Sequence, residues 1–187
     1  MSCPICDHLP TESRNPLPDA AGGLRERNPE RVDIGGFADL WDCRACGRFY
    51  IFTLYIGVDS NLLGDGGDQT LEKLTLEQSE VIRAMLACTA DPAAVEDALF
   101  ALPKPAFNLT VAAALEKDRD FVALFIPRLL HAWAARTHDT GSLVMSLAEQ
   151  PPSYAREVLA AATSLPAELR DKLGDLEARC RAAITSS

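Results

Sequence analysis

The sequence predicts an α+β protein that is mainly α, in which a small β-hairpin module precedes a bundle or short array of six or seven helices. Residues 37–41 and 49–56 are dense in aromatic and β-branched side chains, which favour strands. From about residue 71 onward, apolar residues recur every three or four positions, which indicates amphipathic helices. A segment rich in glycine and aspartate separates the two patterns. We therefore expect a module at 1–60, a junction at 61–70 and a helical domain at 71–187.

Composition limits the classes of function. The chain has 187 residues and a net charge of −9, from 18 basic and 27 acidic side chains. Binding to a phosphate backbone requires clustered basic residues, so this balance disfavours nucleic acid and anionic membranes as partners. No apolar run approaches the 18 or so residues that a membrane-spanning helix needs, and the first residues do not resemble a signal peptide. We expect a cytoplasmic protein whose partner is another protein.

Four of the six cysteines form two C-x₂-C pairs, Cys3-Pro-Ile-Cys6 and Cys43-Arg-Ala-Cys46, with 36 residues between them. A gap of two residues lets the chain turn so tightly that two sulfur atoms reach one ion, and two such turns complete a tetrahedral shell of four thiolates. Gly47 follows the second pair, where such a turn often requires a positive φ. We predict one structural Zn²⁺ per chain, bound by Cys3, Cys6, Cys43 and Cys46.

Residues 1–56 resemble a zinc ribbon, of the broad group that shares rubredoxin-like knuckles. The motifs Cys-Pro-Ile-Cys and Asp-Cys-Arg-Ala-Cys-Gly-Arg-Phe provide the match. The chain departs from the commonest form in two ways: Asp7 replaces the usual glycine after the first pair, and the 36-residue interval is longer than in compact ribbons. The resemblance implies a structural module, and no family is recognised over the remaining residues.

Other interpretations of the cysteine pairs are weaker. Rubredoxin-like sites can contain iron, but zinc is the commoner ion in a ribbon attached to a larger protein. A redox dithiol would suit one isolated C-x₂-C pair beside a βαβ unit, and a catalytic zinc needs an open coordination position that four cysteines do not leave. His8 is an alternative ligand, but four thiols already complete the shell.

Residues 10–36 contain four prolines and four glycines among mixed charges, which is typical of an irregular loop. A short strand at 31–34 is the one regular element that we expect there. The loop could be a contact surface or an inert excursion between the two cysteine pairs.

The helical part has several start and stop signals. Thr75-Leu-Glu-Gln78 is a capping box, and Asp91-Pro92 is an N-cap followed by proline at the first helical position. Pro127 lies within a long apolar segment and should kink or split its helix. We expect helices over about 75–88, 91–102, 105 or 108–117, 118–136, 139–150, 153–163 and 164–184.

The remaining candidate residues indicate no assembled active site. His131 and His138 lie a heptad apart and could form a second metal site with Cys88 and Cys180, but such scattered residues do not have the spacing of a metal site. Cys88 and Cys180 are better interpreted as inward-facing, apolar positions. We predict no catalytic residue and no cofactor besides zinc.

These observations favour a non-enzymatic protein that mediates protein–protein interaction or regulation. One specific form is an inhibitor or immunity-type protein, because small acidic proteins can neutralise basic enzymes through complementary charge. A nucleic-acid-associated, transcription-related zinc-ribbon regulator is the first alternative, with Arg44 and Arg48 as phosphate contacts. A small enzyme with scattered catalytic residues is the second.

Overall fold

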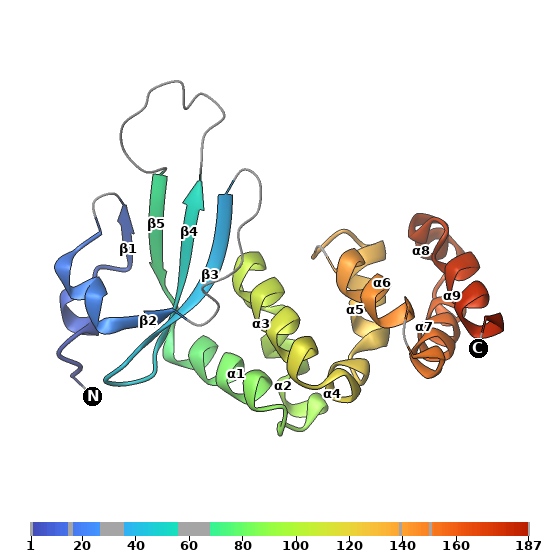
Figure 1. Cartoon of the computed structure of the whole chain (residues 1–187), viewed down its shortest axis with the longest axis horizontal. Helices are drawn as coiled ribbons and strands as arrows, with labels where there is room; N and C mark the ends of the chain where they lie inside the picture. The colour runs from blue at the N-terminus through green and yellow to red at the C-terminus, as the bar shows by residue number, and fades with distance from the viewer. Residues whose placement is uncertain are drawn as a thin grey trace. The chain divides into compact units, whose positions relative to one another are not determined.

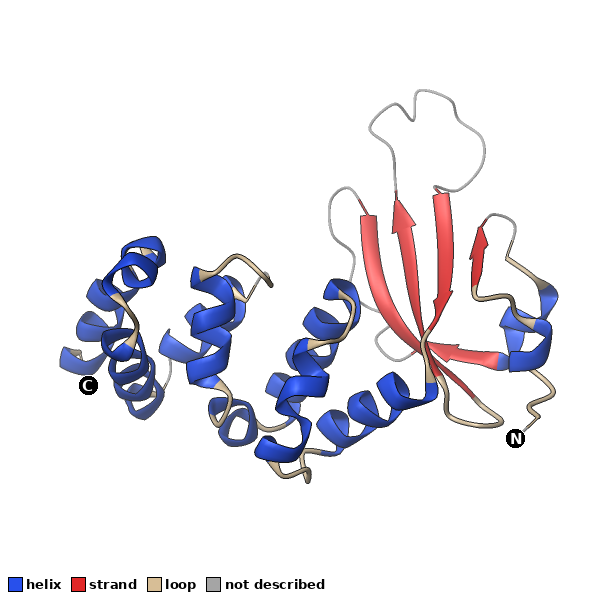
Figure 2. Ribbon diagram, turned by 180° about the vertical axis from the view of Figure 1, so that it is seen from behind, coloured by secondary structure: helices blue, strands red, loops and turns tan. Residues whose placement is uncertain are grey.

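The computed structural model describes residues 2–14, 17–26, 36–55, 68–138, 140–149 and 151–186. These residues form a small antiparallel sheet followed by a series of helices, so the α+β, mainly α class is confirmed. Figure 2 shows the strands gathered in one sheet, with short helical turns of the N-terminal segment beside it and the other helices later in the chain.

Within the described residues the sheet has five strands in the order β1-β5-β4-β3-β2, and every pair is antiparallel (Figure 1). The strands are β1 (Glu12–Arg14), β2 (Leu24–Glu26), β3 (Gly36–Cys43), β4 (Phe49–Tyr55) and β5 (Asp68–Lys73). Two short 3₁₀ helices accompany them, η1 (Cys6–His8) and η2 (Asp19–Gly23).

The predicted hairpin is confirmed, since β3 and β4 pair from Gly36 opposite Tyr55 to Asp42 opposite Phe49. The turn between these strands contains the second cysteine pair. The hairpin therefore places Cys43 and Cys46 at the end of the two longest strands, on well-paired backbone.

The expectation of an irregular loop over residues 10–36 is wrong for the part that the structure describes. That part contains β1, η2 and β2, and the strand expected at 31–34 lies outside the described residues. The junction expected at 61–70 also differs, because β5 begins at Asp68, while 61–67 are not described. Each of β1 and β2 is three residues long and is stabilised by pairing with a distant strand, so no local hydrophobic alternation marks it.

Nine α-helices follow in the described residues, where the sequence predicts six or seven. They are α1 (Leu76–Ala87), α2 (Pro92–Phe100), α3 (Lys104–Lys117), α4 (Arg119–Ala123), α5 (Ile126–Ala134), α6 (Gly141–Glu149), α7 (Pro152–Ser164), α8 (Ala167–Arg170) and α9 (Leu176–Thr185), with a 3₁₀ turn, η3 (Asp171–Leu173), after α8.

Two of the expected helices are split. The segment 118–136 divides into α4 and α5, with Pro127 in the first turn of α5. A backbone N–H in the first turn has no partner within the helix, so proline loses no hydrogen bond there. The segment 164–184 divides into α8, η3 and α9. Gly174 has a φ of +61° between η3 and α9, a conformation that glycine adopts freely and that ends the helix.

The chain forms two compact units. One comprises residues 1–84 with 98–110 and contains the whole sheet, and the other comprises 85–97 with 111–187. We call them the sheet unit and the helical unit. Their limits differ from the predicted 1–60 and 71–187, because β5 and the start of α1 belong with the sheet.

The helical unit has α7 at its centre, packed against α5, α6 and α9. Its core is formed by aliphatic side chains with no exposed surface, such as Leu129, Leu130, Val144 and Val158. Cys180 is fully buried among them and acts as a small apolar residue, as the sequence predicts. In the part of the chain that the structure describes, no helix is long and apolar enough to cross a membrane.

Tyr154 on α7 links the core of the helical unit to α4. Its ring is buried, and its hydroxyl donates a hydrogen bond to the exposed carboxylate of Asp120. This hydrogen bond, together with desolvation, raises the pKa of Tyr154 to about 12. Because the neutral phenol is favoured in the folded protein, its contribution to stability is present below the unfolded pKa of about 10 and is lost between pH 10 and 12.

We expect Tyr154→Phe to lower the free energy of unfolding by about 1 kcal/mol at neutral pH, since the partner carboxylate is exposed. The variant should also lose less stability than the wild type between pH 10 and 12. Urea denaturation across this pH range measures both effects. Ser164→Ala, which removes an exposed hydroxyl from the same helix, is the control, and an unfolding curve for Tyr154→Phe that coincides with the control would contradict the prediction.

Candidate metal centre

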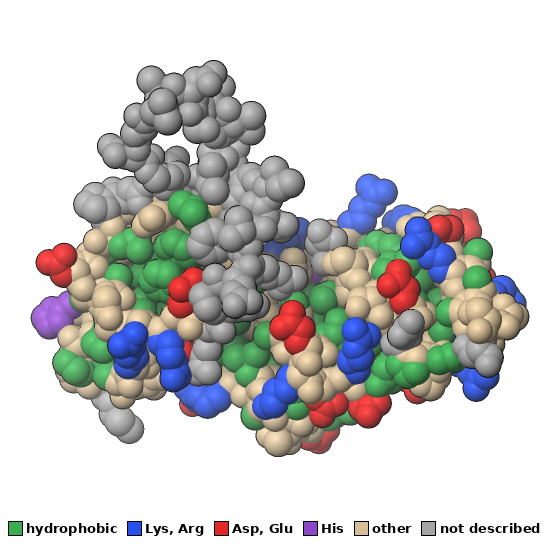
Figure 3. All heavy atoms as spheres, in the orientation of Figure 1, with side chains coloured by type: hydrophobic (Ala, Val, Ile, Leu, Met, Phe, Trp, Pro, Cys, Tyr) green, Lys and Arg blue, Asp and Glu red, His purple; other side chains and the backbone are tan. Residues whose placement is uncertain are grey.

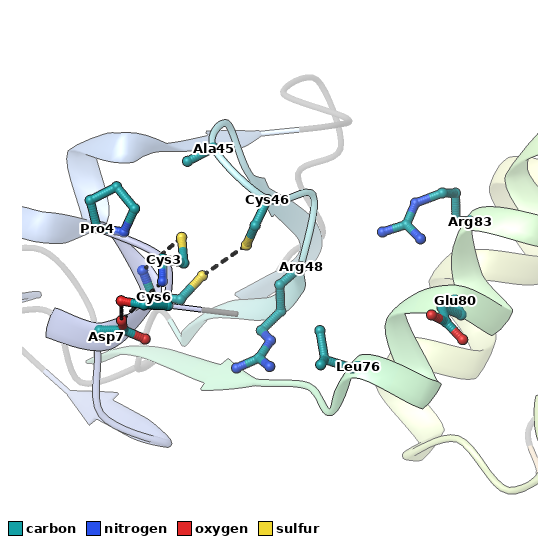
Figure 4. A pocket seen from close by; sticks show the side chains of 11 residues that line it. Cys3, Pro4, Cys6, Asp7, Ala45, Cys46, Arg48, Leu76, Glu80 and Arg83 are labelled. Atoms are coloured by element: carbon teal, nitrogen blue, oxygen red, sulfur yellow. Dashed lines mark hydrogen bonds between the residues drawn. The ribbon is translucent and has the colours of Figure 1, made fainter.

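The four cysteines of the two C-x₂-C pairs meet at one point of the sheet unit. Their sulfur atoms all lie within 4.8 Å of one another. The Sγ atoms of Cys3 and Cys43 are 3.7 Å apart. Those of Cys6 and Cys46, which Figure 4 shows, are 3.4 Å apart. A disulfide bond measures about 2.05 Å, whereas the edges of a sulfur tetrahedron around an ion at about 2.3 Å are about 3.8 Å. The cluster therefore has the dimensions of a metal site, and all four thiols are free.

The first pair lies on a tight turn that leads into η1. The Cys6 backbone N–H points at the Cys3 sulfur at 3.4 Å, and the Asp7 N–H donates to the Cys3 carbonyl at 3.0 Å. In return the Asp7 carboxylate accepts the Cys3 N–H at 2.9 Å and the Ser2 hydroxyl at 2.6 Å. Asp7, which departs from the usual zinc-ribbon pattern, thus closes the turn with its own side chain.

The second pair lies on the turn between β3 and β4. Gly47 has a φ of +71°, which confirms the conformation that its position predicts, and its N–H donates to the Cys43 carbonyl at 2.8 Å. The Cys43 N–H in turn donates to the Arg48 carbonyl at 2.8 Å. From α1, the Arg83 guanidinium donates to the Gly47 carbonyl at 3.0 Å, so the helix also contacts this turn.

A small core surrounds the sulfur atoms. Cys3, Cys6 and Cys43 are at most 6% exposed, whereas Cys46 lies at the surface. The side chains around them come from the N-terminal segment and from one face of the sheet: Leu9, Ala21, Leu24, Tyr50, Phe52 and Leu71. Trp41 stacks on Phe52 with ring centroids 4.4 Å apart.

The thiols are in unequal environments. The Cys6 N–H donates to the Cys3 sulfur and lowers the pKa of Cys3 to about 6. Burial has the opposite effect on Cys6 and raises its pKa, although the neighbouring Tyr50 hydroxyl partly offsets this. Burial and the Cys6 sulfur likewise raise the pKa of Tyr50. Several thiolates can coexist in such a place only with a compensating cation, which a bound metal ion supplies.

Two polar side chains connect the cluster to the sheet. Lys73 on β5 donates to the carbonyl oxygens of Cys6 and Leu9, so the end of η1 is bound to a strand that follows it by more than 60 residues. On the other side, Arg25 of β2 forms two hydrogen bonds with the buried Asp42 carboxylate, at 2.9 and 3.2 Å. Asp42 directly precedes Cys43. Sequence reasoning missed Lys73 and Arg25 because only the strand pairing brings them to the site.

The donor set fits a soft or borderline divalent ion in tetrahedral coordination. Among the described residues, no other group of His, Cys, Asp and Glu side chains is close enough to form a metal site. This includes His131, His138, Cys88 and Cys180. The Cys88 thiol instead donates to the Met85 carbonyl at 3.4 Å.

Comparisons with protein-family models, curated proteins and solved structures found no match to this chain. The cysteine cluster and its surroundings are therefore the basis for the function proposed below.

We expect Asp7→Ala to weaken metal binding about tenfold, the lower end of the usual effect of a residue that orients a ligand. The change removes the acceptor for the Cys3 N–H but leaves all four thiols. Competition between the protein and a chromophoric chelator, with Co²⁺ as a coloured probe of thiolate coordination, measures the affinity. Asp19→Ala removes an exposed carboxylate from η2 and should have no effect. Equal affinities for the two variants would show that Asp7 does not support the site.

Proposed function

We propose that Cys3, Cys6, Cys43 and Cys46 bind one structural Zn²⁺ per chain and thereby attach the N-terminal segment to the β3–β4 hairpin. The observation that supports this most directly is the convergence of four sulfur atoms within 4.8 Å, from two turns 40 residues apart in sequence. Hydrogen bonds from backbone N–H groups to sulfur, as at Cys3, are the usual environment of thiolates that bind zinc.

A structural role fits better than a catalytic one, because four thiolates fill a tetrahedral shell and leave no position for a substrate or water. Three of the four ligands are also buried, and Cys46 lies at the surface beside a cavity. Iron would fit the same donor set. We favour zinc because it is the commoner ion in ribbons that are attached to a larger protein, and this site is followed by a larger helical part.

We propose further that the protein is a non-enzymatic partner of other proteins in the cytoplasm, where thiols remain reduced. The net charge of −9 supports a basic protein as the partner, as an inhibitor or immunity-type protein would have. The metal-bound turns and the sheet would hold the surface that contacts the partner in a fixed shape.

A role at nucleic acids is the second candidate, because the side chain of Arg44 is exposed on the second turn. Asp39 and Asp42, which flank it in sequence, are at most 3% exposed, so their carboxylates face away from solvent. On the face drawn in Figure 3, however, acidic side chains are interspersed among the basic ones over much of the surface. This distribution favours a protein partner.

We expect the purified protein to contain about one zinc per chain and to be colourless. Elemental analysis measures the metal, and an iron-thiolate absorption band would contradict the assignment. Cys43→Ser should lose the ion and the protection of residues 2–55 against hydrogen exchange, since structural zinc can supply ~10–16 kcal/mol of folding free energy. The helical unit provides an internal control, because its amides should remain protected. Cys180→Ser should retain the metal.

We expect no measurable binding to duplex or single-stranded DNA at 150 mM salt, because a few exposed arginines lose their phosphate contacts steeply as salt rises. Gel-shift titration with random sequences provides the measurement. Submicromolar binding that is abolished by Arg44→Ala combined with Arg48→Ala would make the nucleic-acid role the better proposal.

A further inference from the structure

A groove lies in the sheet unit between the two cysteine turns and the start of α1. It consists of two cavities of about 490 and 520 Å³, and Arg48 and Leu76 line both of them. The first cavity reaches from the cysteine turns to Arg83, and the second reaches along β5 to Thr11 and Lys73. Each cavity alone has the size of a small-molecule pocket. The two cavities adjoin at Arg48 and Leu76, and together their linings extend from the cysteine turns to β5.

Two arginines from different elements line the first cavity. In Figure 4, Arg48 extends from the second cysteine turn and Arg83 from α1, with its guanidinium directed toward that turn. In the part of the chain that the structure describes, the buried Nε of Arg48 makes no hydrogen bond, and neither arginine forms an ion pair. A guanidinium has five N–H donors in a planar fork that fits a carboxylate with two parallel hydrogen bonds.

The carboxylates of this cavity do not satisfy these donors. Asp7 is occupied by the Cys3 N–H and the Ser2 hydroxyl, and Glu80 lies exposed on α1. A zinc ion with four thiolates would add about two negative charges nearby. The local charge of the groove therefore does not attract every anion. An acidic ligand must be recognised by directed hydrogen bonds, supplemented by apolar contact.

Leu76 provides that apolar contact. Its side chain is 56% exposed at the place where the two cavities join. One exposed leucine alone is unremarkable, but this one lines both cavities together with Arg48. Pro4 and Ala45 extend the apolar lining on the cysteine side.

We propose that this groove binds a short acidic segment of a partner protein that is otherwise basic, with carboxylates on Arg48 and Arg83 and an adjacent apolar side chain on Leu76. The inference rests on the proposed function, because the metal would fix the turns that form one wall. A peptide is favoured over a free anion by the two adjoining cavities, the local balance of charge and the apolar contact.

The test uses the full, metal-loaded chain and NMR titration. The probe is a capped peptide of alternating aspartate and leucine, and its matched control replaces each aspartate with asparagine. We expect the acidic peptide to shift the Nε–H signals of Arg48 and Arg83 and the methyl signals of Leu76. The neutral peptide should bind at least tenfold more weakly. Arg48→Gln, Arg83→Gln and Leu76→Ser should each weaken binding at least fivefold, whereas Arg44→Gln, on the same turn but outside the lining, should not.

Several outcomes would overturn the inference: unchanged signals, equal binding of the two peptides, or unaltered affinity of the groove variants. Acetate or inorganic phosphate that displaces the peptide at equal concentration would instead identify a small-anion site. Metal content is measured for every variant. A wild-type chain without metal would refute the zinc proposal, whereas a metal-loaded chain that ignores the acidic peptide would refute only this one.

Discussion

The convergence of four thiols is the constraint on which the sheet unit depends. Residues 2–9 contain no strand, and their backbone is fixed by the cysteine turn, by Asp7 and by Lys73. The core next to them is small, and three cysteines form part of it. Burying several thiolates together without a compensating cation is unfavourable. A cation at the centre would convert this unfavourable arrangement into the strongest link in the unit, and the hydrophobic side chains around it could then remain few.

Short-range chemistry explains which parts of this arrangement the sequence predicts. The spacing of two residues within each cysteine pair, the positive φ of Gly47 and the reciprocal hydrogen bonds of Thr75 and Gln78 at the start of α1 each arise within a few residues. The β3–β4 hairpin is also local, since its strands are adjacent in sequence. The residue types and their spacing within a short segment are therefore enough to predict these elements.

The elements that sequence reasoning missed depend on partners far away in the chain. β1 is three residues long, and only its pairing with β5 makes it a strand. Lys73 has no local feature that relates it to Cys6, and Arg25 becomes a partner of Asp42 only when β2 lies beside β3. In the helices the opposite error occurred once, at Gly174. Pro127 marks the first break, and the predicted split of that helix is confirmed, whereas the apolar periodicity is continuous across Gly174 and conceals the second.

The pairing of β1 with β5 has a consequence for synthesis of the protein. Glu12 lies opposite Glu72, so the N-terminal segment cannot take its place at the sheet edge until residue 73 has left the ribosome. At ~5–20 residues per second, the first cysteines spend several seconds in the cell before their surroundings are complete. During that interval the cell must keep them reduced, and the order of translation therefore links the maturation of this protein to the redox state of its compartment.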